Sequence, residues 1–190
     1  MPEPFRYDAD YHEYIVGTGE VLPHITGMLE RTGWVDDTWM TEESSERGQA
    51  VHDLTKTYDL GALHLATCAS RHRGYLLAHV AASRALRPAW TAIEEPHVHY
   101  GYRFGGRPDR VGKALQQQTV LEVKTAAPSR AHQIQTALQA ILVSDLYPLP
   151  PEHWLRLTLY LKATGRFKLE QHNHRADFDE AYRIIKVCAA

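Results

Sequence analysis

The sequence predicts a mixed α/β domain in which helices flank a central β-sheet. Two segments, 119–125 and 154–162, are rich in apolar residues with period-two alternation, which is typical of strands. Three others, 38–59, 66–86 and 129–143, place apolar residues at helical spacing. The order is helices, three strands, a helix, two strands and a final helix, which favours an α/β (α+β) sandwich around a mixed sheet.

Length and composition indicate one soluble domain. A chain of 190 residues can fill one core, and 44% hydrophobic with 23% charged residues is ordinary for a globular protein. We divide it into a mainly helical part (1–88), a sheet with its helix (89–172) and a last helix (173–190). No apolar run approaches the ~20 residues that cross a bilayer, and the N-terminus lacks signal-peptide regions. We therefore expect a cytoplasmic protein without membrane contact.

Cysteine and charge content narrow the classes of protein. Cys68 and Cys188 are far apart in the sequence and predict neither a disulfide framework nor a thiolate metal site. A net charge of −2 does not by itself indicate a nucleic-acid binder. Positive residues nevertheless gather around positions 71–73, 84–87, 103–110 and 162–168, although a solvated face is the simpler interpretation of any one cluster.

The N-terminal part is expected to open with a short hairpin and to continue in helices. Loose alternation interrupted by glycines predicts the hairpin over 11–21. A short helix over 27–31 would have Thr26 as its cap. Thr41 or Ser44 would cap the first long helix, whose early turns are acidic.

The centre of the sheet is expected to be a hairpin that follows a first strand over 90–100. Residues 102–111 have extended character, and 112–118 make a plausible connection to the strand over 119–125. That last strand is β-branched and apolar except for one acid and one lysine. Charged groups on such a strand are unusual, because unpaired buried charge is costly.

Two acidic residues of this hairpin would face one another. If its centre lies between Leu115 and Gln116, residues whose numbers sum to 231 are opposed, which pairs Asp109 with Glu122. Opposed Cβ atoms are roughly 5 Å apart, so the two carboxylates can share a hard cation such as Mg²⁺. Lys124 shares the face of Glu122, where it could orient or deprotonate a metal-bound water or stabilise charge on a phosphate.

The downstream elements complete the sheet and its cover. The helix after the central hairpin would carry His132, Gln135 and Gln139 on one face. The next strand alternates leucines with polar residues, which predicts one buried face, and a second hairpin returns through 167–171. A capping box over 177–180 would begin the last helix.

The ordered set of Gly106-Arg-Pro-Asp109, Glu122-Val-Lys124 and a helical Gln135 resembles the PD-(D/E)xK nuclease superfamily, particularly its RecB-type and phage-type exonuclease branches. The resemblance covers roughly residues 41–172. It implies a restriction-endonuclease-like αβββαβ core. The Glu-Val-Lys tripeptide alone is a weak signal, whereas the ordered set is much more specific.

The resemblance also implies a metal site and a mechanism. Asp109, Glu122 and the backbone carbonyl of Val123 would hold Mg²⁺ or Mn²⁺, and Lys124 would serve the hydrolytic water. The segment Arg47-Gly-Gln-Ala-Val-His52 resembles the R-G-x-x-V-H segment of RecB-type nucleases, in which the histidine approaches the metal. Without that context, a histidine on an amphipathic helix is more often structural or exposed.

Two further positions are implied less sharply. Glu94 and Glu95 compete for the role of an accessory acid near the end of the first strand, and we favour Glu95. Gln135 would be the glutamine of a Q-x-x-x-Y motif that fixes the acidic site. Gln139 stands where tyrosine is usual, which weakens the RecB-type assignment more than that to the superfamily.

The expected function is a metal-dependent DNA nuclease of recombination, repair or phage DNA processing. An exonuclease is favoured because no separate recognition domain is visible, and the cell would be bacterial or phage-infected. DNA contacts are expected at Arg47, Arg107, Arg110 and Thr125. A homo-oligomer or a recombination or replication partner is possible.

Two alternatives belong to other classes of protein. One is a non-catalytic nucleic-acid-binding module with a nuclease-like fold inside a larger complex, for which DNA binding would be salt-dependent without cleavage. The other is a zinc enzyme with a histidine site at His97 or His99, motivated by the 12 histidines but unsupported by ligand spacing. Otherwise, these two histidines would be the polar face of an edge strand.

Overall fold

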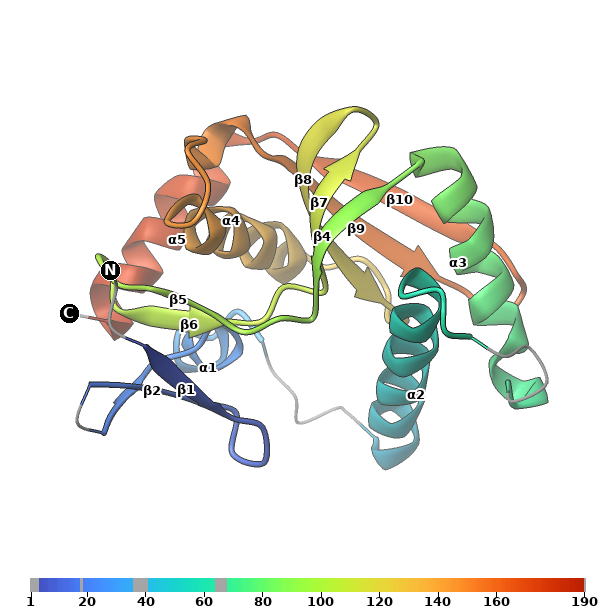
Figure 1. Ribbon diagram of the computed structural model, residues 1–190, viewed down its shortest axis with the longest axis horizontal. Helices are drawn as coiled ribbons and strands as arrows, with labels where there is room; N and C mark the ends of the chain where they lie inside the picture. Colours follow the sequence, from blue (N-terminus) through green and yellow to red (C-terminus); the bar gives the residue numbers. More distant parts are fainter. Residues whose placement is uncertain (1–3, 18, 36–40, 64–67, 190) are drawn as a thin grey trace.

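A five-stranded mixed sheet forms the centre of the molecule (Figure 1). The computed structural model describes residues 4–17, 19–35, 41–63 and 68–189. The strands are β4 (Ala89–Ile93), β7 (Arg110–Ala114), β8 (Gln117–Lys124), β9 (Leu155–Leu161) and β10 (Phe167–His172). They lie in the order β10-β9-β8-β7-β4. β8 and β9 are parallel, and the other neighbours are antiparallel.

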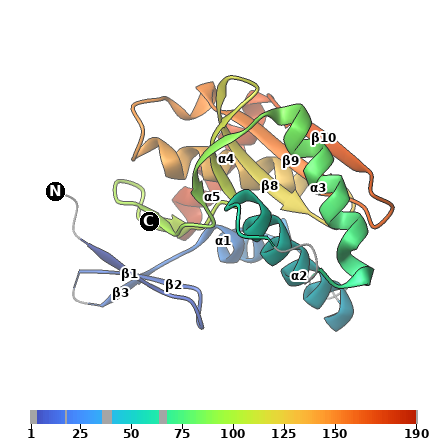
Figure 2. The same cartoon turned by 45° about the vertical axis from the view of Figure 1, so that its right-hand side comes forward.

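Helices cover both faces of this sheet (Figure 2). They are α1 (Ile25–Arg31), α2 (Glu42–Asp59), α3 (Arg73–Leu86), α4 (Arg130–Ser144) and α5 (Arg175–Cys188). α4 packs against one face with α1 and α5 beside it, and α3 packs against the other. The order α3-β4-β7-β8-α4-β9 is the expected αβββαβ arrangement, which confirms the predicted fold class.

The central hairpin has the expected register. Arg110 pairs with Leu121, two numbers that sum to 231, and the remaining pairs follow the same rule. Leu115 and Gln116 form a two-residue turn, and their φ angles of 51° and 64° agree with a type I′ turn. Because neither residue is the Asn or Gly usual in such turns, pairing of the strands, and not local preference, holds this turn closed.

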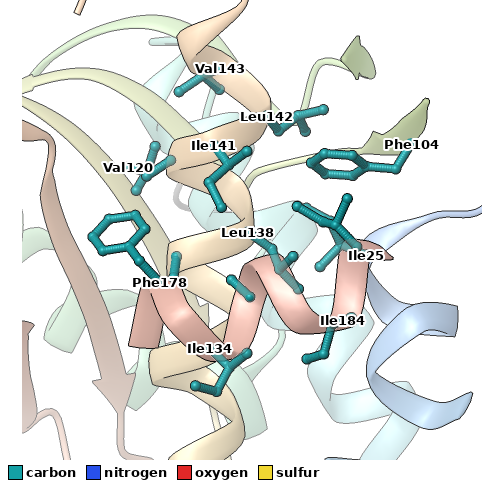
Figure 3. Packing of buried hydrophobic residues seen from close by; sticks show 14 of the residues in the cluster. Ile25, Phe104, Val120, Ile134, Leu138, Ile141, Leu142, Val143, Phe178 and Ile184 are labelled. Atoms are coloured by element: carbon teal, nitrogen blue, oxygen red, sulfur yellow. The ribbon is translucent and has the colours of Figure 1, made fainter. Parts of the chain in front are cut away.

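The larger core lies on the α4 side of the sheet (Figure 3). Ile134, Leu138 and Ile141 of α4 are fully buried between the sheet and the two neighbouring helices. Val120 of β8 and Phe178 of α5 complete the packing around them. Helix α4 therefore has little freedom to move, and side chains that it directs towards β8 are held in place.

The N-terminal part confirms the expected hairpin. β1 (Phe5–Asp8), β2 (Glu13–Val16) and β3 (Glu20–Leu22) form a separate antiparallel sheet. Thr41 caps α2 by accepting a hydrogen bond from the N–H of Ser44 at 3.2 Å, which settles the choice between the two candidates. The cap of α1 was predicted wrongly, because the helix begins at Ile25 and His24 accepts the N–H of Gly27.

The segment 90–100 is not one strand as expected. β4 ends at Ile93, and Glu94 then takes a left-handed φ of 50° that turns the chain. The next residues form β5 (His97–His99), which pairs with β6 (Phe104–Gly106) in a two-stranded sheet of its own. His99 is buried against the ring of Phe104 at 5.8 Å between centroids, so it does not line a polar edge.

The later elements differ from expectation in two details. All seven residues of β9 are buried, not only its leucines, because α3 and α4 cover opposite faces of the strand. The last helix begins at Arg175 and has no side-chain cap bond. The residue expected in its capping box, Asp177, binds the buried Arg156 of β9 instead, at 2.9 Å.

Three remaining points bear on the predicted boundaries. A 3₁₀ turn, η2 (Ser70–His72), precedes α3, which is shorter than the segment 66–86. The helices predicted over 38–59 and 66–86 were expected to start at residues 38–40 and 66–67, which lie outside the described residues. Within the described part of the chain, no helix combines the length and apolar character that a bilayer span requires.

Candidate metal centre and its cavity

Strand β8 ends in an acid and a lysine that face α4. The apolar neighbours of both residues pack on the α3 side, so alternation along the strand directs Glu122 and Lys124 to the opposite face. Glu122 accepts hydrogen bonds from Nε2 of Gln135 at 2.8 Å and from Nε2 of Gln139 at 2.6 Å. Its Oε1 also accepts from Nζ of Lys124 at 2.7 Å. Three donors therefore fix the orientation of this buried carboxylate.

Asp109 lies directly before β7, beside the end of β8. Its Oδ2 accepts the N–H of Val123 at 2.7 Å, and its Oδ1 lies 3.4 Å from Nδ1 of His52 on α2. Arg110 pairs with Leu121, so the same register places Asp109 opposite Glu122, one residue beyond the last pair of the two strands. Both acids consequently border the same space.

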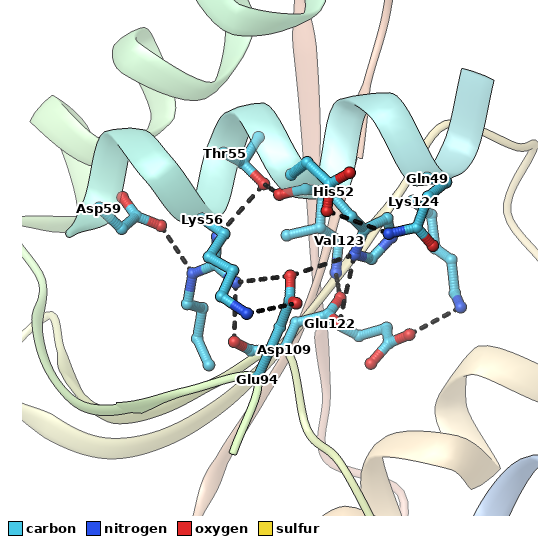
Figure 4. Close-up of polar contacts among 12 residues, drawn as sticks. Gln49, His52, Thr55, Lys56, Asp59, Glu94, Asp109, Glu122, Val123 and Lys124 are labelled. Atoms are coloured by element: carbon cyan, nitrogen blue, oxygen red, sulfur yellow. Dashed lines mark hydrogen bonds and ion pairs between the residues drawn. The ribbon is translucent and has the colours of Figure 1, made fainter. Parts of the chain in front are cut away.

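Glu94 brings a third carboxylate to this space (Figure 4). It follows the end of β4, and its Oε2 accepts from Nζ of Lys56 at 3.3 Å. One ligand atom from each of His52, Glu94 and Asp109 can be chosen so that all lie within 4.8 Å of one another. This spacing suits side chains that converge on a single cation.

Burial and charge together set the ionisation of this group. The negative charge of Asp109 raises the pKa of His52 to about 9, against the opposing effect of burial. Burial alone would raise the pKa of Asp109, but the facing charges of His52 and Lys124 lower it to about 2. Burial would lower the pKa of Lys124, but Glu122 and Asp109 outweigh it and hold that pKa above its ordinary value. Lys124 is therefore a cation at neutral pH.

Arg110 supports the site from beneath. Its side chain is fully buried, with Nε 2.6 Å from Asp59 and one amino group 3.2 Å from Oγ1 of Thr55. The other amino group donates to the backbone carbonyl of Asp109 at 2.7 Å. His79 completes the set at 2.9 Å from Asp59. The expectation that Arg110 contacts DNA is wrong, because this guanidinium has no access to the surface.

The acids line one cavity of about 230 Å³. Several parts of the chain close it, including Gln49 of α2, His12 and Tyr14 of the N-terminal sheet, and Arg107 before β7. The guanidinium of Arg107 also stacks on the Tyr7 ring at 5.8 Å. Helix α2 thus forms one wall of the cavity, and the small N-terminal sheet forms another.

The structure brings together most of the predicted site residues. Asp109, Glu122, Lys124, Gln135 and His52 all line this cavity. The backbone carbonyl proposed as a metal ligand belongs to a residue whose N–H binds Asp109, and its role as a ligand stays a prediction.

Other predicted residues lie elsewhere. Glu95 is exposed, and Glu94, which has a left-handed φ of 50°, lines the cavity in its place. Arg47 lines a different cavity, nearer the start of α3. Thr125 is half-buried just beyond β8 and does not line the acidic cavity.

Two residues of this cavity, Gln139 and Glu94, were not predicted from the sequence as members of the candidate site. Gln139 was treated as a departure from a family pattern, yet its amide binds Glu122 as directly as that of Gln135 does. The i, i+4 spacing of these glutamines on a helix facing an acidic strand was the available signal. The sequence signal for Glu94 is weaker, since an adjacent acid offers the same chemistry.

The residues present fit a divalent cation. Oε1 of Glu94 is buried and accepts no hydrogen bond, although the nearest cationic groups lie 3.8 and 3.9 Å away. A buried carboxylate oxygen without a partner is costly unless a cation completes it. Carboxylate oxygens with one imidazole nitrogen suit Mg²⁺ or Mn²⁺ better than the thiolate-rich sites of softer metals.

Comparison with known proteins yields only distant structural likenesses. No family model and no curated protein matches the chain. A crystal structure from Eubacterium rectale, provisionally named an exonuclease, aligns over 85% of this chain and 69% of its own, with 11% identity and a TM-score of 0.45. That of the protein SSO0001 aligns over 86% and 84%, with 15% identity and a TM-score of 0.35. Both TM-scores are below 0.5, so neither likeness indicates a function for this chain.

Proposed function

We propose that this protein is a metal-dependent nuclease that hydrolyses phosphodiester bonds in DNA, acting as an exonuclease. The supporting observation is the cavity in which the cluster of His52, Glu94 and Asp109 adjoins the pair of Glu122 and Lys124. Three carboxylates converge there, and the buried Oε1 of Glu94 accepts no hydrogen bond. Acids and an imidazole within reach of one ion, at a cavity that Arg107 and Lys124 also line, suit a cation together with an anionic substrate.

The ligands proposed for Mg²⁺ or Mn²⁺ are Asp109, Glu94 and His52, with Glu122 at the edge of the same site. When bound, the cation supplies Lewis-acid polarisation of the phosphodiester and lowers the pKa of water. His52 must lose its proton to become a ligand, so metal binding is expected to release a proton from it. Gln135 and Gln139 act by holding the Glu122 carboxylate in position.

Lys124 is proposed as an electrostatic catalyst. Glu122 and Asp109 hold its pKa above the ordinary value against the effect of burial, which favours the charged ammonium. Its charge lies 2.7 Å from Glu122, at the edge of the cavity where a phosphate would carry extra negative charge in the transition state. Of the roles considered from the sequence, stabilisation of that charge is therefore favoured over deprotonation of water.

The test is digestion of end-labelled linear and closed circular DNA with Mg²⁺, Mn²⁺ or EDTA. An exonuclease should degrade only the linear DNA, only with metal, and not when Lys124→Ala replaces the wild type. Nicking of the circle would replace the exonuclease assignment with an endonuclease. DNA binding without cleavage of either substrate would replace the nuclease with a non-catalytic binding module.

Two adjacent acids provide a matched control for the location of the site. Glu94→Gln and Glu95→Gln remove the same charge one residue apart, but only Glu94 lines the cavity. Glu94→Gln should reduce cleavage about 10²-fold or more, in line with the loss of one charge-stabilising group in a preorganised site. Glu95→Gln should cleave as the wild type does, and equal losses in both variants would contradict the proposed ligand set.

A further inference from the structure

Positive residues from three segments that are distant in the sequence lie close together near the N-terminal ends of α2 and α3. Arg47 of α2 and Arg71 of η2 line one cavity of about 270 Å³, together with Ala163 of the turn between β9 and β10. Arg73 begins α3 next to η2. Lys162 and Arg166 belong to the same turn as Ala163, where the N–H of Lys162 donates to the carbonyl of Arg166 at 3.0 Å. We call this set of five cations the basic ridge.

Close packing of backbone holds the basic ridge together. A Cβ atom added to Gly74 of α3 would lie 1.7 Å from the carbonyl oxygen of Ala163, so only glycine permits this approach. On the same side, a Cβ at Gly165 would lie 4.0 Å from Cβ of Leu77. Figures 1 and 2 both show the start of α3 beside the turn between β9 and β10. The juxtaposition of charges is therefore a fixed feature of the fold.

The ridge carries charge that the protein does not neutralise by ion pairing. Within the described chain, ion pairs of lysine and arginine within 4.0 Å all involve other residues. Glu43 and Glu46 line the cavity together with Arg47 and Arg71, so the positive surplus of the ridge comes from Arg73, Lys162 and Arg166. Nε of Arg47 is buried without a hydrogen-bond partner. Arg71, Arg73, Lys162 and Arg166 are exposed.

The ridge is also placed where a bound strand would pass. Lys124 and the turn after β9 lie at the same end of the sheet, because β8 and β9 are parallel and Lys124 pairs with Tyr160. Helix α2 connects the two regions: His52 and Gln49 face the acidic cavity, and Arg47, in the turn before, faces the ridge. A chain of phosphates leaving the acidic cavity along α2 would reach the ridge.

We propose that the basic ridge binds the phosphate backbone of DNA whose scissile bond occupies the acidic cavity. The inference rests on the proposed function for the choice of DNA, and its basis is charge complementarity between a polyanion and clustered cations that lack ion pairs. A protein with a net charge of −2 can bind DNA in this way because the local surplus, and not the overall charge, faces the strand.

The test measures DNA binding in EDTA, where no metal-dependent cleavage occurs. Anisotropy of a fluorescein-labelled linear DNA is recorded for the wild type and for Arg71→Ala/Arg166→Ala, between about 50 and 200 mM NaCl. The ridge variant should lose affinity about tenfold at low salt. Its slope of log K against log [NaCl] should become shallower by about 1.5, since each lost phosphate contact removes about 0.7 to 0.9.

Arg84→Ala/Lys113→Ala is the matched control. It removes the same charge from two exposed cations elsewhere, one of them in the last turn of α3. The control should retain the wild-type affinity and slope. A ridge variant that binds like the wild type, equal losses in ridge and control variants, or no salt-dependent binding by the wild type would each overturn the proposal.

This test is separate from that of the nuclease. If digestion fails with every metal but binding depends on the ridge, the ridge proposal stands and the catalytic one falls. If digestion occurs and the ridge variant binds DNA as the wild type does, the catalytic proposal stands and the ridge proposal falls. Because the four exposed ridge side chains pack against little, the variant should melt at the wild-type temperature, and that melt serves as the folding control.

Discussion

Two regions of the molecule bury charge on the α4 side of the sheet, and they do so differently. In the acidic cavity, Glu94, Asp109 and Glu122 converge, and one oxygen of Glu94 has no hydrogen-bond partner. At the start of β9, Arg156 binds Asp177 at 2.9 Å, the carbonyl of Gln133 at 3.0 Å, and the Phe178 ring at 4.6 Å.

The difference indicates what each region is for. The cavity beside Arg156, at about 840 Å³, is larger than the acidic one, at about 230 Å³. Size therefore does not identify the candidate site. A buried arginine whose counter-charge and hydrogen bonds lie inside the protein stabilises structure, whereas acids whose oxygens converge on a cavity can bind an external cation. The predictions below separate these two roles.

Asp109→Asn should have the largest effect on activity. The amide keeps an oxygen to accept the N–H of Val123 but removes the charge that holds a cation, so cleavage should fall about 10³-fold or more. The measurement is the single-turnover rate of DNA digestion. Asp179→Asn, an exposed acid beside the larger cavity, should have no effect. Retained cleavage in Asp109→Asn would remove this residue from the mechanism.

Asp177→Ala should have the largest effect on stability. It leaves Arg156 buried without its counter-charge, which is expected to cost about 3 to 5 kcal/mol of unfolding free energy. Arg183→Ala, on the same helix, removes the exposed partner of an ion pair with Glu180, leaves the hydrogen bond from Trp34 to Glu180 in place, and should cost little free energy of unfolding. Urea denaturation of both variants provides the measurement. Equal losses would show that the Arg156 region is not a closed structural unit.

A divalent cation that binds in the acidic cavity should stabilise the folded protein against unfolding. Mn²⁺ at a hundredfold its dissociation constant should add about 2.7 kcal/mol to the free energy of unfolding, seen as a higher melting temperature. Asp109→Asn should abolish the shift, and Asp179→Asn should retain it. A shift that survives in Asp109→Asn would mean that the cation binds elsewhere.

His132, whose pKa is lowered by burial and in part by the charge of Lys124, should produce a smaller, pH-dependent effect. Its Nδ1 lies 2.9 Å from the Tyr160 hydroxyl, and burial, followed by the charge of Lys124, lowers its pKa to about 4. A depressed pKa contributes stability above the unfolded value of 6.5, and this is lost as pH falls towards 4. The loss should be about 1 to 2 kcal/mol, allowing for partial exposure.

The measurement is the free energy of unfolding between pH 7 and pH 4 for the wild type and His132→Gln. Carboxylates titrate in both proteins, so only the difference between the two curves reports on His132. Between pH 7 and pH 4, the wild type should lose more free energy of unfolding than His132→Gln does. Parallel curves would mean that His132 keeps an ordinary pKa.

Much of the site follows from strand periodicity and the register of one hairpin. Alternation along β8 is enough to put Glu122 and Lys124 on one face, and a two-residue turn at Leu115 and Gln116 is enough to bring Asp109 level with Glu122. These are local consequences of chain geometry. They hold because a shift of one residue would expose the apolar face of the strand.

Other features required the assembled fold. The chain turns after β4 with a left-handed φ at Glu94, and in the assembled fold Glu94 lines the cavity while Glu95 is exposed. The burial of Arg110 depends on Asp59, which is 51 residues away in the chain. The sequence also gave no sign that β9 would be covered on both faces, because its polar residues resemble those of a solvated strand until Asp177 and His172 supply their partners.

By itself, the sequence determined the order of the long helices and of the central-sheet strands, the pairing of the central hairpin, and the acid and lysine on its face. These depend on side-chain periodicity and on interactions between residues close in the chain. Only the tertiary structure decided which acids converge, which arginines are sealed inside, and which cations gather in the basic ridge. Each of these depends on the relative placement of distant segments, which the packing of helices against both faces of the sheet establishes.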